Sequence, residues 1–387
     1  MRLPVVPSPQ GPQGRSPVPQ SKKILYAAST FGHLKNFHLP YIQALHKEGH
    51  QIWCAAQGDS GFMPAYATCV ELPFTKSYSS PCNISVVRSV ARLMRRERFD
   101  VVLTHTSLAA FFVRLGVALA GKGSTRVVNT VHGYLFDDAS SPVKRAMLLG
   151  AEKLVAPATD LVVTMNCCDT VIAAEHSLGR EPVVQVPGMG VPLDGLRPAA
   201  LEEKRTARRE LGLPQDAFVL LYAAEFSGRK NQGLLIEALA QLPPSVLLAL
   251  PGTGERLDAC RDLAASRGAA ARVLFPGHVN DLASWRAASD LCVSSSRSEG
   301  LPFHVIEAMA CGLPAVLTQV KGHEDLVCPG ENGLLFPFGD ASACADCIRG
   351  LFLDRLRVKT MGEKAVASAK PYDLASVQPQ LLELYRS

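Results

Sequence analysis

The sequence lacks the features of several large classes of protein. It contains no uninterrupted apolar run of eighteen residues or more, so we expect no transmembrane helix. The motifs GxGxxG, GxxxxGKS/T, HExxH and DxD are absent as well. These absences argue against a dinucleotide oxidoreductase, a P-loop enzyme and a zinc hydrolase.

The chain also lacks a strong charge of either sign. Its formal net charge is +5, and the basic residues are dispersed. We therefore expect no nucleic-acid partner, while a membrane surface or an anionic small ligand remains open. The first twenty residues contain six prolines and no apolar core of a signal peptide, so 1–20 is predicted to be a disordered, proline-rich leader.

Cysteine is plentiful, with eleven residues, but it follows no disulfide or metal-binding pattern. Most lie in apolar runs, as small buried side chains do in a reducing compartment. The pair Cys344 and Cys347 forms a lone CxxC without a second pair or a histidine at ligand spacing, and Cys167-Cys168 is equally isolated. We expect no metal site, no cofactor and a cytoplasmic location.

The chain does contain a repeated alternation of short apolar strands and helices. A strand at 22–30, one helix at 31–49 and a strand at 51–57 form a βαβ unit, which implies a parallel sheet. The alternation continues and starts again after a proline-containing linker at 187–198. A chain of 387 residues is long enough for two cores.

We therefore predict an α/β chain with two doubly wound, Rossmann-like domains that face each other across a cleft. The N-terminal domain is expected over 21–195 and the C-terminal domain over 196–370. A last helix, 371–387, follows a Pro-Tyr break and can pack back on the N-terminal domain.

A helix expected over 84–100 is unusually basic. Its arginines either contact anionic lipid or form a solvated face, and the solvated face is the simpler interpretation. They are Arg88, Arg92, Arg95, Arg96 and Arg98.

The stretch EGLPFHVIE, residues 299–307, lies between two short apolar strands. Pro302 suits the first turn of a helix, so Glu299 is expected just before the helix and Glu307 within it. A helix N-terminus offers unpaired N–H groups and a partial positive charge. Two carboxylates near such an end can bind the hydroxyl groups of a ligand whose phosphate the helix holds.

Other polar residues follow predicted strands, where folds of this kind bind ligands. Lysine and arginine at such a turn suit a diphosphate, although a solvated turn is the alternative. A histidine followed by glycine at the end of a strand is expected to have a functional rather than a structural role, because glycine lets a ligand approach the backbone closely. A small-residue turn that ends at Gly254 can take a nucleobase or ribose, or be an ordinary loop. The groups are Gly32-His33, His132-Gly133 and Arg229-Lys230.

These motifs resemble glycosyltransferase family 4, which has the GT-B architecture of two Rossmann-like domains. The resemblance extends from about Lys22 to the C-terminus and is most specific in the two glutamates separated by seven residues. The segments HLKNFHLPYIQAL, TVHGYLFDD and PGMGVPLD resemble bacterial members that extend capsule, exopolysaccharide or lipopolysaccharide chains.

The resemblance implies a role for each group. Glu299 would hold hydroxyls of the donor sugar and Glu307 those of the ribose, while Lys230 would neutralise the leaving phosphate. The catalytic residues would be His132, Lys230 and Glu299. Donor-binding residues would be Arg229, Lys230, Gly254, Glu299, Gly300, Leu301, Phe303, His304 and Glu307, with the diphosphate on the amides of Phe303 and His304. The acceptor side would include Gly32, His33, His132 and Gly133.

The implied reaction is a retaining transfer from a nucleotide-diphosphate sugar, foremost a UDP-sugar, without a metal. The acceptor would be a lipid-linked or growing glycan in cell-surface polysaccharide synthesis, with peripheral contact to the inner membrane leaflet. Two departures stand out: Glu225 occupies the position of an arginine in many relatives, and Phe31-Gly32-His33 replaces paired glycines. The alternatives are a nucleotide-sugar epimerase of the same fold and a catalytically silent binding or scaffold subunit.

Overall fold

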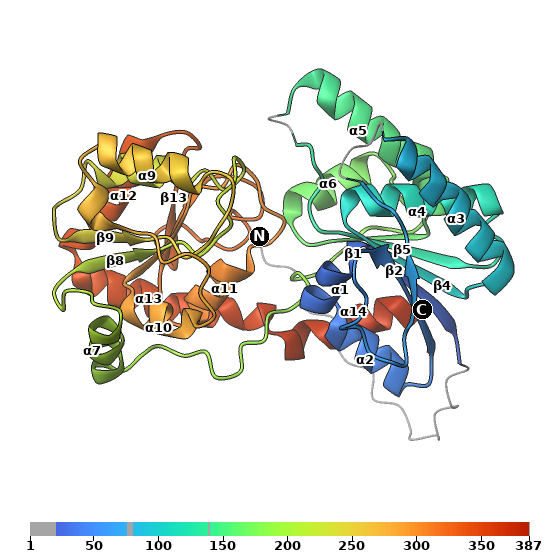
Figure 1. Ribbon diagram of the computed structural model, residues 1–387, viewed down its shortest axis with the longest axis horizontal. Helices are drawn as coiled ribbons and strands as arrows, with labels where there is room; N and C mark the ends of the chain where they lie inside the picture. Colours follow the sequence, from blue (N-terminus) through green and yellow to red (C-terminus); the bar gives the residue numbers. More distant parts are fainter. Residues whose placement is uncertain (1–20, 76–79, 138–139, 387) are drawn as a thin grey trace.

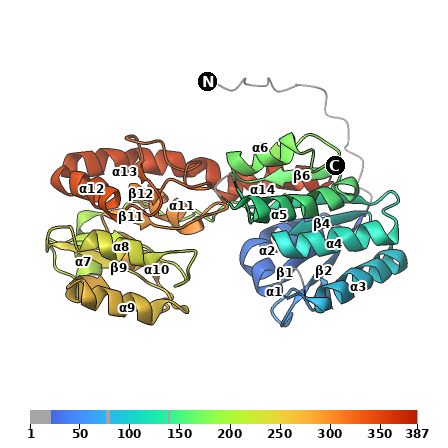
Figure 2. The same cartoon turned by 90° about the horizontal axis from the view of Figure 1, so that it is seen from above.

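The computed structural model describes residues 21–75, 80–137 and 140–386. These residues form two α/β domains that lie side by side (Figure 1, Figure 2). The predicted leader over 1–20 and the last residue, Ser387, lie outside the described residues.

The first domain is built on a seven-stranded sheet with the order β3-β2-β1-β4-β5-β6-β7 and parallel pairing throughout. Its central strands are apolar and buried on both faces, as a parallel sheet covered by helices requires. The strands are β1 Lys23–Thr30, β2 Gln51–Gln57, β3 Thr68–Glu71, β4 Val101–His105, β5 Arg126–Val131, β6 Leu161–Thr164 and β7 Val184–Gln185.

Helices cover both faces of this sheet. The apolar sides of α3 and α4 form one core with it, while α1, α2 and the C-terminal α14 form a core on the other face. The helices of this domain are α1 Phe31–Phe37, α2 Leu39–Lys47, α3 Pro81–Glu97, α4 Ser107–Ala120, α5 Pro142–Val155 and α6 Cys167–Glu175, with a 3-10 turn at Ala156–Ala158.

The second domain repeats the plan with a six-stranded parallel sheet, β10-β9-β8-β11-β12-β13. The strands are β8 Phe218–Leu221, β9 Val246–Ala249, β10 Val273–Leu274, β11 Leu291–Ser294, β12 Ala315–Thr318 and β13 Gly333–Phe336. The helices are α7 Leu201–Glu210, α8 Gln232–Leu239, α9 Leu257–Ser266, α10 Leu282–Ala288, α11 Phe303–Ala310, α12 Ala341–Leu353 and α13 Arg355–Ala369, with 3-10 turns at Ala270–Arg272 and Lys370–Tyr372.

The single helix expected over 31–49 is wrong, because the structure has two helices there. The chain leaves helical geometry at His38, which has φ −121° and ψ −10°. Pro40 follows, and a proline has no N–H to donate within a helix, so it is tolerated only in the first turn of a new one. The break turns the ring of His38 into the interior, where it is fully buried.

The basic helix is α3, which ends at Glu97, one residue before Arg98. Arg98 therefore lies just beyond the helix, in the left-handed region at φ 51°, rather than on its face. All five of the predicted arginines are exposed, and Arg95 donates to the carbonyl of Leu119 at 2.8 Å.

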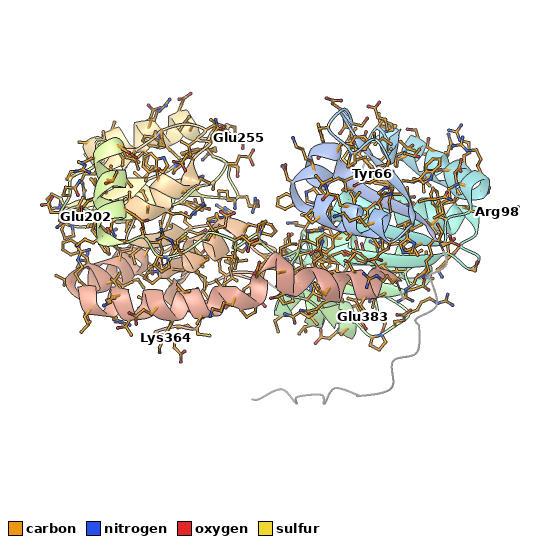
Figure 3. The ribbon with its side chains drawn as sticks, turned by 90° about the horizontal axis from the view of Figure 1, so that it is seen from below. Tyr66, Arg98, Glu202, Glu255, Lys364 and Glu383 are labelled. Carbon is orange, nitrogen blue, oxygen red and sulfur yellow. The ribbon has the colours of Figure 1, made fainter. Side chains whose placement is uncertain are left out.

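The last helix, α14, spans Leu374–Arg386 and packs on the first domain (Figure 3). Val377, Leu381 and Tyr385 join the core that contains β1. The chain thus crosses between the domains twice, and the two crossings lie against each other. Val191 donates from N–H to the Tyr372 carbonyl at 2.8 Å and accepts from Leu374 N–H at 2.9 Å.

None of the helices in the described part of the chain is long and apolar enough to span a bilayer. All eleven cysteines are free thiols. Cys344 and Cys347 lie on α12, where Cys344 is buried.

Candidate active site

A cavity of about 1330 Å³ lies between the two domains, at the carboxyl ends of both sheets. Parallel sheets bind ligands at this edge, where the loops after the strands meet. Residues of both domains line it, so a ligand held there would contact both. From the first domain come His33, Phe37, His132 and Gly133, and from the second Arg229, Lys230, Glu299, Gly300, Leu301, Phe303 and His304.

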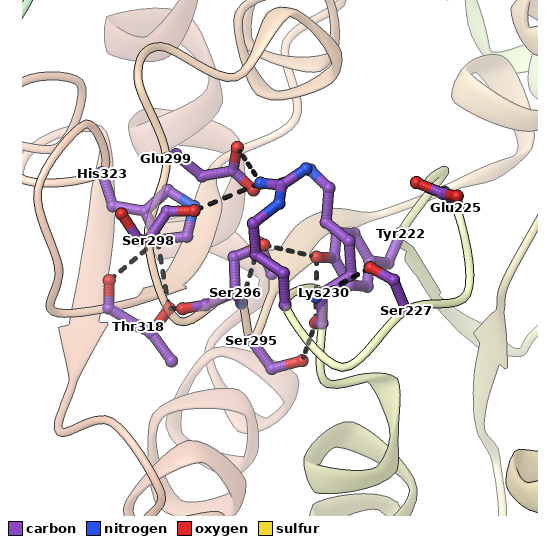
Figure 4. Close-up of polar contacts among 12 residues, drawn as sticks. Tyr222, Glu225, Ser227, Lys230, Ser295, Ser296, Ser298, Glu299, Thr318 and His323 are labelled. Atoms are coloured by element: carbon purple, nitrogen blue, oxygen red, sulfur yellow. Dashed lines mark hydrogen bonds and ion pairs between the residues drawn. The ribbon is translucent and has the colours of Figure 1, made fainter. Parts of the chain in front are cut away.

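A buried carboxylate with two cationic partners lies on the second-domain side (Figure 4). Lys230 Nζ is 2.6 Å from Glu299 Oε1, and an Arg229 guanidinium nitrogen is 2.8 Å from Glu299 Oε2. Glu299 and Lys230 are each only 8% exposed, whereas half of the Arg229 side chain reaches solvent. Burial alone would raise the pKa of Glu299, but the two cations lower it to about 2. The carboxylate is therefore ionised at neutral pH.

The loop that carries Lys230 is fixed by hydroxyl groups from the neighbouring strand ends. Tyr222 Oη donates to the Lys230 carbonyl at 3.1 Å, and Ser295 Oγ donates to the same carbonyl at 3.2 Å. Ser296 Oγ is 2.7 Å from Tyr222 Oη. Two hydroxyl groups thus fix the Lys230 carbonyl, and Glu299 holds the ammonium group, so Lys230 is positioned before any ligand arrives.

The helix α11 begins at the cavity wall directly after Glu299-Gly-Leu-Pro. Its N-cap is Pro302, whose side chain accepts no hydrogen bond, so the first-turn amides of Phe303 and His304 remain available to an anion. Both residues line the cavity. The predicted placement of Glu299 before the helix and Glu307 inside it is confirmed.

The backbones of the two domains come close together at a pair of glycines. Gly133 follows His132 with φ +118°, and its Cα faces Gly300. A Cβ atom on Gly300 would lie 2.0 Å from the His132 carbonyl oxygen. A side chain larger than hydrogen therefore cannot fit at Gly300 while the cleft has this width.

Comparisons with known proteins agree with this geometry. The family described as "Glycosyltransferase Family 4" matches residues 41–181, and that described as "Glycosyl transferases group 1" matches residues 203–367. EpsD of Bacillus subtilis (strain 168), a protein named as a glycosyltransferase, is 31% identical over 369 residues, which cover 94% of this chain and 96% of EpsD. This chain belongs to glycosyltransferase family 4.

Two further similarities extend this result. An Escherichia coli protein named UDP-Gal:alpha-D-GlcNAc-diphosphoundecaprenol alpha-1,3-galactosyltransferase is 26% identical, over 67% of this chain and 69% of its own. The crystal structure of Anabaena Alr3699/HepE in complex with UDP and glucose superposes with a TM-score of 0.75 at 21% identity, over 95% of this chain and 100% of that one. The predicted GT-B fold is thereby confirmed, and the family makes the chain a glycosyltransferase.

Some predicted site residues of this glycosyltransferase lie outside the cavity lining. Gly32 lies in the first turn of α1 and does not line the cavity, although its neighbour His33 does. Gly254 packs against its own domain, since a Cβ there would lie 2.3 Å from the Phe226 carbonyl oxygen. Glu225 is exposed at the loop after β8, and its carbonyl accepts from the side chain of Gln232 at 2.8 Å.

Glu307 lies one turn into α11, away from the main cavity. Its carboxylate pairs with Arg286 at 3.0 Å, and it lines a small separate pocket together with His304. Burial raises the pKa of Glu307, and Arg286 opposes that shift. The contact of Glu307 with a ribose stays a prediction. For that contact, the carboxylate must either separate from Arg286 or bind the ribose hydroxyls while it remains paired with Arg286.

The glycosyltransferase also has contacts across the cleft that the sequence did not reveal. Buried Lys321, in the loop after β12, donates to the Tyr134 carbonyl at 2.5 Å and to Asp169 Oδ1 at 3.1 Å. Asp325 accepts from the Cys167 N–H at 2.7 Å. The position of Lys321 just after a strand was the one available signal, but its partner is 152 residues away in the sequence.

Proposed function

We propose that this glycosyltransferase moves a hexose from a UDP-sugar to a lipid-linked or growing glycan, with retention of anomeric configuration, in cell-surface polysaccharide synthesis. The observation that carries the proposal is the pair Lys230–Glu299 beside the open N-terminus of α11 in an interdomain cavity. The similar proteins include one named as a UDP-galactose enzyme and one whose structure contains UDP, and these support the choice of donor.

In this proposal the second domain binds the donor. The amides of Phe303 and His304 and the ammonium of Lys230 meet the diphosphate, and Glu299 accepts hydrogen bonds from sugar hydroxyls. Arg229, which already contacts Glu299, supplies the second positive charge that Glu225 cannot supply. As the bond from sugar to phosphate breaks, negative charge grows on the leaving phosphate. Fixed cations and helix amides stabilise that charge, and such terms are often the largest in catalysis.

The donor site so described needs no metal held by an Asp-X-Asp pair, because Lys230 and Arg229 supply positive charge at the diphosphate. His132 and His33 line the opposite wall, where the acceptor would enter. Contact between Gly133 and Gly300 would bring that wall onto the donor and exclude water.

The test is transfer by the purified protein. UDP-, GDP- and ADP-hexoses are offered with polyprenyl-diphosphate monosaccharides, and the lipid product is analysed by mass spectrometry and NMR. An extended lipid with the donor's anomeric configuration, formed from a UDP-sugar, is the expected result. Release of an epimerised sugar without acceptor would instead establish an epimerase. Absence of binding to all three nucleoside diphosphates would establish a silent subunit.

We further propose that the protein contacts the anionic inner leaflet through α5 rather than through the arginines of α3. Val143, Met147 and Leu154 are 80%, 62% and 64% exposed. They are spaced four and then seven positions apart, which places them on one side of the helix. Lys144 and Lys153 flank them, and the helix's one acidic residue is buried. An apolar stripe with basic neighbours is the pattern of an interfacial helix.

Replacing Val143, Met147 and Leu154 together by serine is expected to lower binding to vesicles that contain phosphatidylglycerol by about a hundredfold, because each side chain contributes about 1 kcal/mol when it is partly buried in the membrane interface. Vesicle flotation measures the change. The matched control replaces Leu201, Leu353 and Leu356, equally exposed leucines of the second domain. Equal losses in both triple variants, or a loss in neither, would contradict this surface.

A further inference from the structure

Four histidines gather at the carboxyl end of the first sheet, on the acceptor wall of the cavity. His33 comes from α1, His38 from the break before α2, His105 from the end of β4 and His132 from the loop after β5. One ring nitrogen from each of His33, His38 and His132 lies within 4.8 Å of the other two. No sequence motif brings them together, because the sheet topology places three separate segments at one edge.

Several nitrogens of this cluster have no partner. Nε2 of His38 is fully buried, and neither it nor Nε2 of His33 makes a hydrogen bond within the described chain. The other nitrogen of His38 does have a partner, Tyr26 Oη at 3.0 Å. When His38 Nδ1–H donates to that oxygen, Nε2 carries a free lone pair. Buried polar atoms are nearly always satisfied, so a repeated exception indicates a missing ligand.

The cluster also has the right charge for a cation. Burial lowers the pKa of His33 to about 4, and burial with the neighbouring imidazoles lowers the pKa values of His38 and His132 well below the ordinary value. At neutral pH the three rings are therefore neutral, and neutral imidazole is the form that ligates metals. One metal ion between the rings would provide a partner for all of the free nitrogens together, whereas one hydrogen bond would provide a partner for only one of them.

We propose that His33, His38 and His132 bind a divalent transition-metal ion of the Zn²⁺ class. Zinc–nitrogen bonds of about 2.0–2.1 Å place tetrahedral ligand nitrogens about 3.3 Å apart, so the rings must rotate toward one another when the ion binds. Tyr26, which holds Nδ1 of His38, and His105, whose Nδ1 is 3.3 Å from His132 Nε2, act as positioning residues.

Three protein ligands leave a fourth position open, as in zinc sites that bind a substrate or water. His33 and His132 line the cavity, so this position faces the acceptor end. An oxygen of the acceptor, a hydroxyl or a phosphate, is the ligand that fits it. The ion is thus separate from the diphosphate of the donor, which Lys230 and α11 hold in the other domain. Metal binding does not rest on the proposed function.

The test uses the full chain without a histidine tag, freed of metal by chelation and titrated with Co²⁺. We expect one equivalent to produce the visible absorption of four-coordinate cobalt, and Zn²⁺ to displace it and raise the unfolding temperature. The variants His33→Asn and His132→Asn, whose side chains are partly exposed and should not disturb folding, are each expected to weaken binding by at least about a hundredfold, beyond the loss typical of outer-shell partners.

The control His278→Asn changes an exposed histidine of the second domain and should bind cobalt as the wild type does. Absence of the cobalt band in the wild type would overturn the proposal, as would unchanged binding in His33→Asn and His132→Asn. The spectrum is recorded without donor or acceptor, so failure of metal binding would leave the proposed transfer reaction untouched. Conversely, a protein that shows the cobalt band but transfers no sugar would contradict the proposed reaction and support the metal site.

Discussion

Replacing Lys230 with methionine is expected to lower kcat for sugar transfer by about two to three orders of magnitude, the loss seen when one fixed charge-stabilising group is removed. Its ammonium is the buried cation of the cavity, held in place by Glu299 at 2.6 Å and by a fixed backbone. Methionine keeps the length and apolar stem of the side chain but not the charge. Binding of UDP, measured by calorimetry, should weaken at the same time.

The chain offers a matched control for the loss of the ion pair itself. Lys204 Nζ lies 2.7 Å from Asp290, which also pairs with Arg208, just as Glu299 pairs with Lys230 and Arg229. Lys204→Met should reduce stability in a similar way but leave kcat of the folded protein unchanged, since neither Lys204 nor Asp290 lines the cavity. If Lys230→Met kept more than about a tenth of kcat, the ammonium would not be the group that stabilises the leaving phosphate.

Replacing Gly300 with alanine is expected to lower kcat about a hundredfold while the fold and donor affinity change little. A Cβ there would lie 2.0 Å from the His132 carbonyl oxygen of the other domain, so the cleft cannot keep its present width. A displacement near 1 Å between reacting groups can cost about a hundredfold in rate. Steady-state kinetics separate kcat from KM, and small-angle X-ray scattering measures the expected rise in radius of gyration.

Gly350→Ala is the control for Gly300→Ala, because Gly350 lies on helix α12 with open space around it. It should leave both the rate and the radius of gyration unchanged. A Gly300→Ala protein with wild-type kcat would show that transfer does not require the contact between Gly133 and Gly300.

The sequence predicted the parts of this protein that depend on local pattern. Short buried strands, the turn at Pro302 and the helix that contains Glu307 all follow from periodicity and from residues with restricted backbones. Family resemblance then placed Glu299 and Lys230 on one cavity, although they are 69 residues apart.

What the sequence did not predict depends on contacts between distant segments. Lys321 resembles any strand-end lysine until the fold places Asp169 beside it. Likewise, His38 and His105 lie in stretches that resemble ordinary helix and strand, and only the sheet order brings their rings together. The apolar spacing across His38 matches one continuous helix, so periodicity alone does not predict the break that precedes Pro40.

The double crossing between the domains restricts how this enzyme can open. Two chain segments joined at Val191 and Asp373 resist twisting and sliding better than one linker would, so we expect the domains to move relative to each other mainly by rotation about this pair. Gly190 permits the joint, since a Cβ there would lie 2.6 Å from the Leu374 Cα. If the motion is such a hinge rotation, a single distance between fluorophores on the two domains is expected to follow it through the catalytic cycle.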